Sequence, residues 1–171
     1  MDNRAFLKSA TRDVHRRTEA RWVGSEGFSD RRAYEDWLHA MLAVHSSVSL
    51  PAARKLARRD FIAEEHLRLD ALRRDLDQPT LLPTPPCRHS DAWAWGAQYV
   101  VNGSAMGACI LLKSGQVDVR WPHAYLKVMS GFAKGGALKG FFEELDQLAL
   151  NRDEALAGAE AAFPRAVVRA A

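Results

Sequence analysis

The stretch from Leu7 to Glu19 reads Leu-Lys-Ser-Ala-Thr-Arg-Asp-Val-His-Arg-Arg-Thr-Glu and predicts an amphipathic helix. The helical period places positions i, i+4, i+7 and i+11 on one stripe, and here they hold Lys8, Arg12, His15 and Glu19. From Lys8 to His15 the helix rises roughly 10 Å at 1.5 Å per residue. Such a stripe suits a flat anionic ligand with a central metal, because the imidazole can hold the metal while the cations reach the acidic rim. The alternative interpretation is an ordinary solvated polar face.

A second segment, from Tyr99 to Leu112, reads Tyr-Val-Val-Asn-Gly-Ser-Ala-Met-Gly-Ala-Cys-Ile-Leu-Leu and predicts an apolar helix. Gly103 and Gly107 fall on one face of it, one turn apart. Glycine inside a helix costs about 1 kcal/mol relative to alanine, so two glycines in one turn indicate a close approach to the backbone. The approaching group is either a ligand or another helix.

Together the two segments resemble heme oxygenases. Residues 7–19 closely resemble the start of that family, in which the matching histidine is the proximal iron ligand, and residues 99–107 resemble the distal helix of its bacterial members. Similar stretches follow in the family's order at residues 34–45, 69–76 and 161–163. The resemblance therefore implies an all-α fold over residues 1–171, a single-domain heme-oxygenase-like helical bundle with a kinked distal helix.

The resemblance also implies a reaction. Heme would be both cofactor and substrate, cleaved at a meso carbon to biliverdin, carbon monoxide and ferrous iron with O2 and external electrons. Because the sequence has no flavin or nicotinamide fingerprint, we expect the electron donor to be a ferredoxin or an NAD(P)H-dependent reductase.

The resemblance assigns roles to residues on both sides of the heme. His15 would bind the iron, and Glu19 would accept a hydrogen bond from the other ring nitrogen, which fixes the tautomer. A solvent-exposed carboxylate is the alternative for Glu19. The residues expected to contact heme besides these two are Lys8, Arg12, Tyr99, Lys134 and Lys139. Tyr99 is equally consistent with a buried core tyrosine.

The distal positions carry the expected catalytic chemistry, at Asn102, Gly103, Ser104 and Gly107. The glycines would leave room for oxygen, and Ser104 and Asn102 would hold proton-delivering waters. Three residues depart from the family pattern. Asn102 replaces an acid common in bacterial members, Ala108 replaces a second glycine, and Ser104 stands where animal members have a catalytic aspartate.

Two other functions use similar helical scaffolds. A heme carrier or sensor would bind heme without degrading it. A non-heme di-iron oxidase needs several carboxylates and acid-x-x-histidine pairs on facing helices, and here only Asp36 and His39 have that spacing. His45 is expected to be a hydrogen-bonded core histidine rather than a ligand.

Composition predicts one soluble domain. The chain has 171 residues, of which 47% are hydrophobic, and no apolar stretch approaches the roughly 20 residues that cross a bilayer. We expect a cytoplasmic monomer with free thiols at Cys87 and Cys109, because no signal peptide or C-x-x-C pair is present. The formal charge is +3, the paired arginines are scattered, and no motif for nucleic acid accompanies them.

Helical periodicity and capping residues predict the order of elements. After the first helix we expect a helix from a Ser29-Asp30 cap to about Ser47, a short helix begun by Pro51, and a helix from an Asp60 cap to about Leu76. A proline-rich loop over 78–89 should follow, and then a long helix from Ser90-Asp91 to about Lys113, with Gly115 after it. The remaining elements are a short helix from Pro122, a helix ending near Leu150, and a last helix capped by Asn151 and shortened by Pro164.

Overall fold

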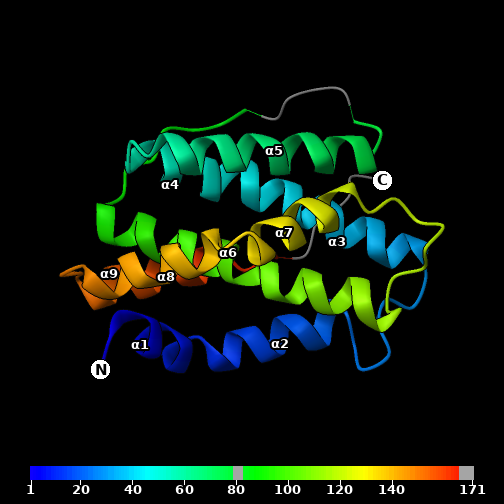
Figure 1. Ribbon diagram of the computed structural model, residues 1–171, viewed down its shortest axis with the longest axis horizontal. Helices are drawn as coiled ribbons and strands as arrows, with labels where there is room; N and C mark the ends of the chain where they lie inside the picture. The colour runs from blue at the N-terminus through cyan, green and yellow to red at the C-terminus, as the bar shows by residue number, and fades with distance from the viewer. Residues whose placement is uncertain (79–82, 166–171) are drawn as a thin grey trace.

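The computed structural model describes residues 1–78 and 83–165, and these ranges contain helices and no strand (Figure 1). The elements are α1 (Asn3–Ala10), α2 (Arg12–Trp22), α3 (Arg31–Val44), the π-helical turn η1 (His45–Ser49), α4 (Leu50–Lys55), α5 (Arg59–Asp75), α6 (Asp91–Ser114), α7 (Ala124–Lys134), α8 (Ala137–Gln147) and α9 (Arg152–Ala161). The all-α fold predicted from the sequence is confirmed. The described part of the 78–89 loop is not helical, and residues 79–82 lie outside the described residues.

The long helix α6 is the centre of the bundle and packs against α4, α7, α8 and α9. Its closest neighbour is α9, because the two backbones touch at glycines. A Cβ built on Gly96 would lie 1.8 Å from the carbonyl oxygen of Ala155, and one built on Gly158 would lie 1.9 Å from that of Trp93. No other residue fits at either position, so this pair of glycines sets the crossing of α6 and α9.

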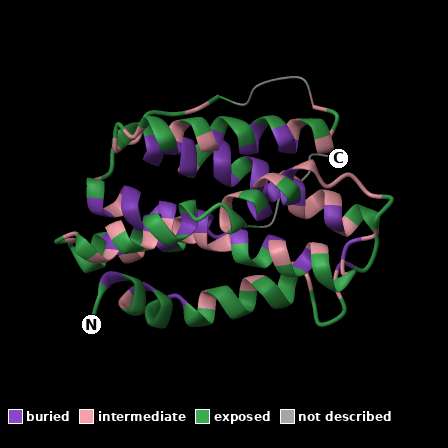
Figure 2. Cartoon of the chain, in the orientation of Figure 1, coloured by how far each residue is buried: buried purple, intermediate pink, exposed green. Residues whose placement is uncertain are grey.

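The buried residues gather on the inner faces of the central helices, whereas α2 has none (Figure 2). Helices usually gain their stability by burying an apolar face, so a helix without a buried residue needs another reason to stay in place.

Several predicted helix ends are confirmed. The Ser90 side chain accepts a hydrogen bond from the backbone N–H of Trp93, and the Asn151 side chain accepts from those of Asp153 and Glu154. Gly115 ends α6 in the left-handed conformation at φ 72°, and Pro51 lies in the first turn of α4. These ends depend on local chemistry, which a sequence displays directly.

The first helix is divided into two, which the sequence did not predict. Thr11 separates α1 from α2, and its hydroxyl donates to the carbonyl of Leu7 at 2.7 Å. Backbone hydrogen bonds still join Thr11 to Leu7 and His15 to Thr11. The predicted polar stripe is therefore shared between two consecutive helices, with Lys8 on α1 and the other three residues on α2.

The second helix also ends earlier than predicted. The α-helical part of it stops at Val44 instead of Ser47, and the chain continues as η1, whose hydrogen bond runs from the Leu50 N–H to the His45 carbonyl. Serine hydroxyls compete for the carbonyls at this point, because Ser46 donates to Leu42 at 2.8 Å. A π-helical turn of this kind adds one residue to the turn and is frequent at functional sites.

Two predicted helix starts are wrong by one or two residues. Asp60 does not cap α5, since Arg58 is the N-cap residue and its guanidinium binds the Asp60 carboxylate instead. The helix expected from Pro122 begins at Ala124. Its free N–H groups are capped from α5, because the Asp75 carboxylate accepts from Ala124 at 2.9 Å and from the next residue at 2.8 Å. The helix expected to end near residue 150 ends at 147.

Candidate functional site

In the view of Figure 1, α2 lies next to the C-terminal half of α6, and hydrogen bonds hold the segments before and after α2. At the α1 end, the Asn3 side-chain amide donates to the carbonyls of Leu145 and Leu148, both at 2.8 Å. Beyond the other end, the Gln116 amide that follows α6 donates to the carbonyl of Ser25 at 3.4 Å. Because the ends are fixed and no residue of α2 between them is buried, side chains along α2 remain open to a ligand.

His15 is the exposed imidazole at the middle of α2. Its side chain is 67% exposed, and its Nδ1 lies 3.8 Å from the nearer carboxylate oxygen of Glu19, beyond hydrogen-bond distance. The ring of Phe163 lies edge-on to it, with centroids 6.1 Å apart. The segment after α9 contacts α2, because the Trp22 indole donates to the carbonyl of Pro164 at 3.3 Å. His15 therefore lies at an open surface with a carboxylate and an aromatic ring as neighbours.

The outer face of α6 combines glycine with exposed apolar side chains. Met106 is 56% exposed and Ile110 is 60% exposed. A Cβ built on Gly107 would meet no described atom within 4 Å, and one built on Gly103 would meet only Phe142, at 4.0 Å. Neither glycine is therefore explained by helix packing within the described residues. Helix α6 remains α-helical through both of them.

Phe142 of α8 joins α1 to this face of α6. The Arg4 guanidinium lies over its ring, 4.5 Å from the centroid, and the Tyr99 ring is 6.1 Å from it. Burial raises the pKa of Tyr99, and the charge of Arg4 opposes that rise. Tyr99 is thus partly buried beside Gly103 at the α1 end of the site.

The predicted cations divide into two groups. Lys8 and Arg12 are exposed near the junction of α1 and α2, seven and three residues before His15. Lys134 is exposed in the last turn of α7, and Lys139 on α8 lies 3.5 Å from Glu143 in an exposed ion pair. Of these four cations, only Arg12 lies on the same helix as His15, and Lys8 lies on α1, the helix directly before it.

Asn102 does not share the outer face with the glycines. It is 2% exposed, accepts from the Arg68 guanidinium at 2.8 Å and donates to Gln98 at 3.4 Å. Ser104 is half-buried and donates to the carbonyl of Val101 at 2.7 Å. Asn102 is therefore directed into the core, where the sequence had suggested a role above the ligand.

A buried network of polar side chains lies behind this face of α6. It consists of His45, Ser49, Glu65, Arg68, Gln98, Asn102 and Tyr125. His45 Nδ1 lies 2.7 Å from a Glu65 carboxylate oxygen, and His45 Nε2 lies 2.9 Å from the Tyr125 hydroxyl. Arg68 donates to the other Glu65 oxygen at 2.6 Å. The prediction that His45 is a hydrogen-bonded core histidine is confirmed.

Charge within the network fixes its protonation. Burial alone would raise the pKa of Glu65, but His45 and Arg68 outweigh it and lower the pKa to about 2. Since the carboxylate is ionised, Nδ1 of His45 donates to it, and Nε2 shares a hydrogen bond with the Tyr125 hydroxyl. Burial raises the pKa of Tyr125 well above its usual value, opposed by Arg68 and by the hydroxyl of Ser104.

Sequence reasoning missed Glu65, Arg68 and Tyr125. A signal for the first two was present, because Phe61, Glu65, Arg68 and Leu72 share the buried side of α5 at i, i+4, i+7 and i+11. A charged pair within an apolar stripe indicates side chains that are buried and paired. Nothing comparable marks Tyr125, whose partner lies 80 residues away.

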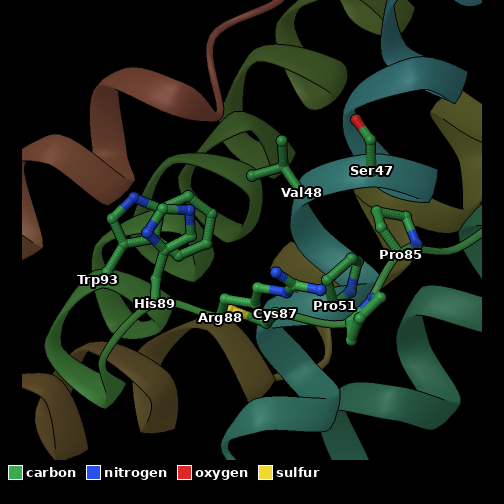
Figure 3. A pocket seen from close by; sticks show the side chains of 9 residues that line it. Ser47, Val48, Pro51, Pro85, Cys87, Arg88, His89 and Trp93 are labelled. Atoms are coloured by element: carbon green, nitrogen blue, oxygen red, sulfur yellow. The ribbon is translucent and has the colours of Figure 1, made fainter.

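Two cavities of about 310 and 340 Å³ lie elsewhere in the described structure. The first is shown in Figure 3, where Arg88 extends toward Pro51 and His89 stacks on Trp93. Neither cavity is lined by His15, Gly103 or Gly107. The candidate site is therefore defined by the exposed surfaces of α2 and α6 rather than by an enclosed volume.

Other expectations concern metals, thiols and membranes. Within residues 1–78 and 83–165, no three His, Cys, Asp or Glu side chains converge on a metal position, so these ranges offer no ligand set for a di-iron centre. Cys87 and Cys109 are both free. None of the described helices has the length and apolar character required to cross a bilayer.

Comparison with family models, curated proteins and solved structures finds no match for this chain. What the site does must therefore be inferred from its own geometry.

Proposed function

We propose that the chain is a heme oxygenase that binds heme between α2 and the C-terminal half of α6. The observation that carries this proposal is α2 itself, a helix that has no buried residue, carries the exposed His15, and is flanked by segments hydrogen bonded to the rest of the bundle. An apolar disc placed there would cover Met106 and Ile110 and give α2 the burial it lacks.

The donor set suits heme. His15 has an open ring nitrogen for iron, and Glu19 is close enough to its Nδ1 to accept a hydrogen bond after a small rotation. Lys8 and Arg12 offer charge-assisted hydrogen bonds to the two carboxylates of heme. The missing side chains of Gly103 and Gly107 leave space on the opposite side. When bound, heme would supply the iron that activates O2 and the carbon skeleton that is oxidised.

The chain's own residues would then orient the ligand and manage protons. His15 would fix the distance of the iron from α2, while the cations fix the rotation of the disc in its plane. Ser104 lies next to Gly103, is half-buried, and donates its hydroxyl to the carbonyl of Val101 at 2.7 Å. It would hold a water that passes protons to the site. Electrons would come from a ferredoxin or an NAD(P)H-dependent reductase.

A hemin titration with a turnover assay tests the proposal. We expect the wild-type chain to bind one hemin with a shifted Soret band and, with O2 and ascorbate or ferredoxin, to release biliverdin and carbon monoxide. His15→Ala should lose the native coordination spectrum, whereas His66→Ala, an exposed histidine on α5, should retain it. Binding without product would instead indicate a heme carrier or sensor. An unchanged spectrum in His15→Ala would contradict the ligand assignment.

A further inference from the structure

A chain of aromatic rings connects the buried network to the surface. Tyr125 lies 5.9 Å from Trp37, Trp37 lies 5.9 Å from Tyr34, and Tyr34 stacks on Trp121 at 5.6 Å, all between ring centroids. The two tyrosines are fully buried, and both tryptophans are partly exposed. Side chains this close can pass electrons rapidly, because electron tunnelling weakens steeply with distance.

The inner end of this chain is equipped for proton-coupled oxidation. A tyrosine gives up an electron readily only when its phenolic proton leaves at the same time. The Tyr125 hydroxyl is 2.9 Å from Nε2 of His45, and the Glu65 carboxylate stabilises the imidazolium that forms from the opposite ring nitrogen at 2.7 Å. Tyr125 therefore has a proton acceptor already in contact.

Tyr34 differs from Tyr125 in this respect. Its hydroxyl is buried without a hydrogen-bond partner among the described residues, so its proton has no acceptor. Burial and the charge of Asp75 both raise its pKa. Tyr34 therefore bridges the two tryptophans without being oxidised itself, while tryptophan can lose an electron and keep its proton.

We propose that Tyr125, Trp37 and Trp121 conduct single oxidising equivalents from the α2–α6 site to the surface, with His45 as the proton acceptor of Tyr125. The starting point rests on the proposed function, because Tyr125 belongs to α7, which packs against α6, the helix that would lie over heme. Such a path would protect the site, since an oxidant that does not react with its substrate would otherwise damage nearby side chains.

The electron balance needs an oxidant and a reductant. The oxidant is a one-electron oxidant of the class that heme forms with peroxide. It takes an electron from Tyr125, whose proton moves to His45. Trp37 then reduces Tyr125, which regains its proton from His45, and Trp121 reduces Trp37 through Tyr34. A soluble reductant such as ascorbate finally reduces Trp121, so one electron passes from reductant to oxidant and the protein is unchanged.

A photochemical experiment on the heme-free, full-length chain tests the path itself. A flash-oxidised ruthenium tris-bipyridine complex, with persulfate as the electron acceptor, should oxidise the accessible tryptophans, and freeze-quench EPR should then show a neutral tyrosyl radical. We expect Tyr125→Phe to lose this signal and Tyr99→Phe to keep it. Trp37→Phe should lower its yield, and Trp93→Phe, whose ring stacks on His89, should not. Circular dichroism checks that each variant is folded.

A second experiment links the path to the proposed site. Hemin-loaded protein treated with peroxide should give the same tyrosyl radical, again lost in Tyr125→Phe. A signal unaffected by Tyr125→Phe in the photochemical experiment, or carried by Tyr99, would overturn the path. If hemin does not bind, the proposed function fails while the photochemical result still decides the path. If hemin binds through His15 but peroxide yields no radical at Tyr125, the connection is wrong.

Discussion

His45 Nδ1 and Glu65 Oε2 lie 2.7 Å apart, and neither side chain is exposed to solvent. The pair joins η1 to α5 at the centre of the bundle, and Arg68 completes the charge balance at 2.6 Å from the same carboxylate. Removing one partner from such a cluster leaves an uncompensated buried charge, which costs far more than the pair contributes. The buried network that reaches α6 through Asn102 therefore depends on the ionised carboxylate of Glu65.

The depressed pKa of Glu65 predicts a loss of stability in acid. The pKa is lowered from 4.5 to about 2 by His45 and Arg68, so the ionised carboxylate favours the folded state. This contribution is fully present above pH 4.5 and disappears as the pH falls through about 2. Glu65→Gln should lower the free energy of unfolding by about 3 to 5 kcal/mol at pH 7. The variant should also lose part of the pH dependence between 4.5 and 2, measured by urea unfolding.

Glu160→Gln on α9 provides the control, because Glu160 is exposed. It should follow the wild-type pH dependence at every pH. An acid transition in Glu65→Gln with the same slope as in the wild type would show that other carboxylates govern acid unfolding.

The sequence predicted what local chemistry determines. The all-α fold follows from helical periodicity. Ser90 and Asn151 cap the starts of α6 and α9 as expected, because an N-cap side chain bonds to residues two or three positions away, and Gly115 ends α6 because glycine readily adopts a positive φ. The spacing of Glu65 and Arg68 within the apolar stripe of α5 was visible in the sequence and was overlooked. Tyr125 escaped prediction because its partner His45 lies 80 residues away. The same applies to the start of α7, which is capped by Asp75 from another helix rather than by its own sequence.

The glycines also show that contacts between distant segments are harder to predict than local features. Sequence reasoning selected Gly103 and Gly107 as places of close approach, yet the backbone contacts are at Gly96 and Gly158. Which glycine faces a neighbouring helix depends on how α6 and α9 cross, and no single segment contains that information. The first pair retains its predicted role only through the proposed ligand.

Gly96→Ala should destabilise the protein strongly. Its Cβ would lie 1.8 Å from the carbonyl oxygen of Ala155, and a backbone atom cannot move aside without separating α6 from α9. Overpacking of this kind costs about 3 kcal/mol or more when the backbone must shift. The midpoint of urea unfolding should fall accordingly. Gly131→Ala, where a Cβ meets nothing described within 4 Å, should leave the protein as stable or slightly more stable.

Asp75→Ala should loosen α7. The carboxylate accepts hydrogen bonds from the backbone N–H groups of Ala124 and Tyr125, and their loss should cost about 1 to 2 kcal/mol of stability. Hydrogen exchange should speed up first at those two amides. Asp75→Asn, which retains an oxygen acceptor, should recover much of the loss. Unchanged exchange in the alanine variant would mean that another group caps the helix.

Arg12→Ala and Lys8→Ala should weaken the binding of hemin without changing its coordination. Both side chains are exposed, so each charge contributes no more than about 1 kcal/mol, or several-fold in Kd, and less at high salt. Titrations at low and high salt measure this directly. Lys127→Ala on α7 serves as the matched cation. Equal losses in all three variants would indicate general attraction of an anion rather than contacts at the rim of heme.

Gly107→Leu separates a ligand from helix packing as the reason for glycine in α6. No described atom lies within 4 Å of a Cβ at Gly107, and Gly131 on α7 is open in the same way. Leucine at either position should therefore leave the heme-free fold intact and favour the helix by up to about 1 kcal/mol. Only Gly107→Leu should place its side chain where heme is proposed to lie, and we expect its hemin Kd to rise about tenfold or more, or about 1.4 kcal/mol. If Gly107→Leu and Gly131→Leu bind hemin equally well, heme does not approach α6 at this turn, and the glycine has no ligand to accommodate.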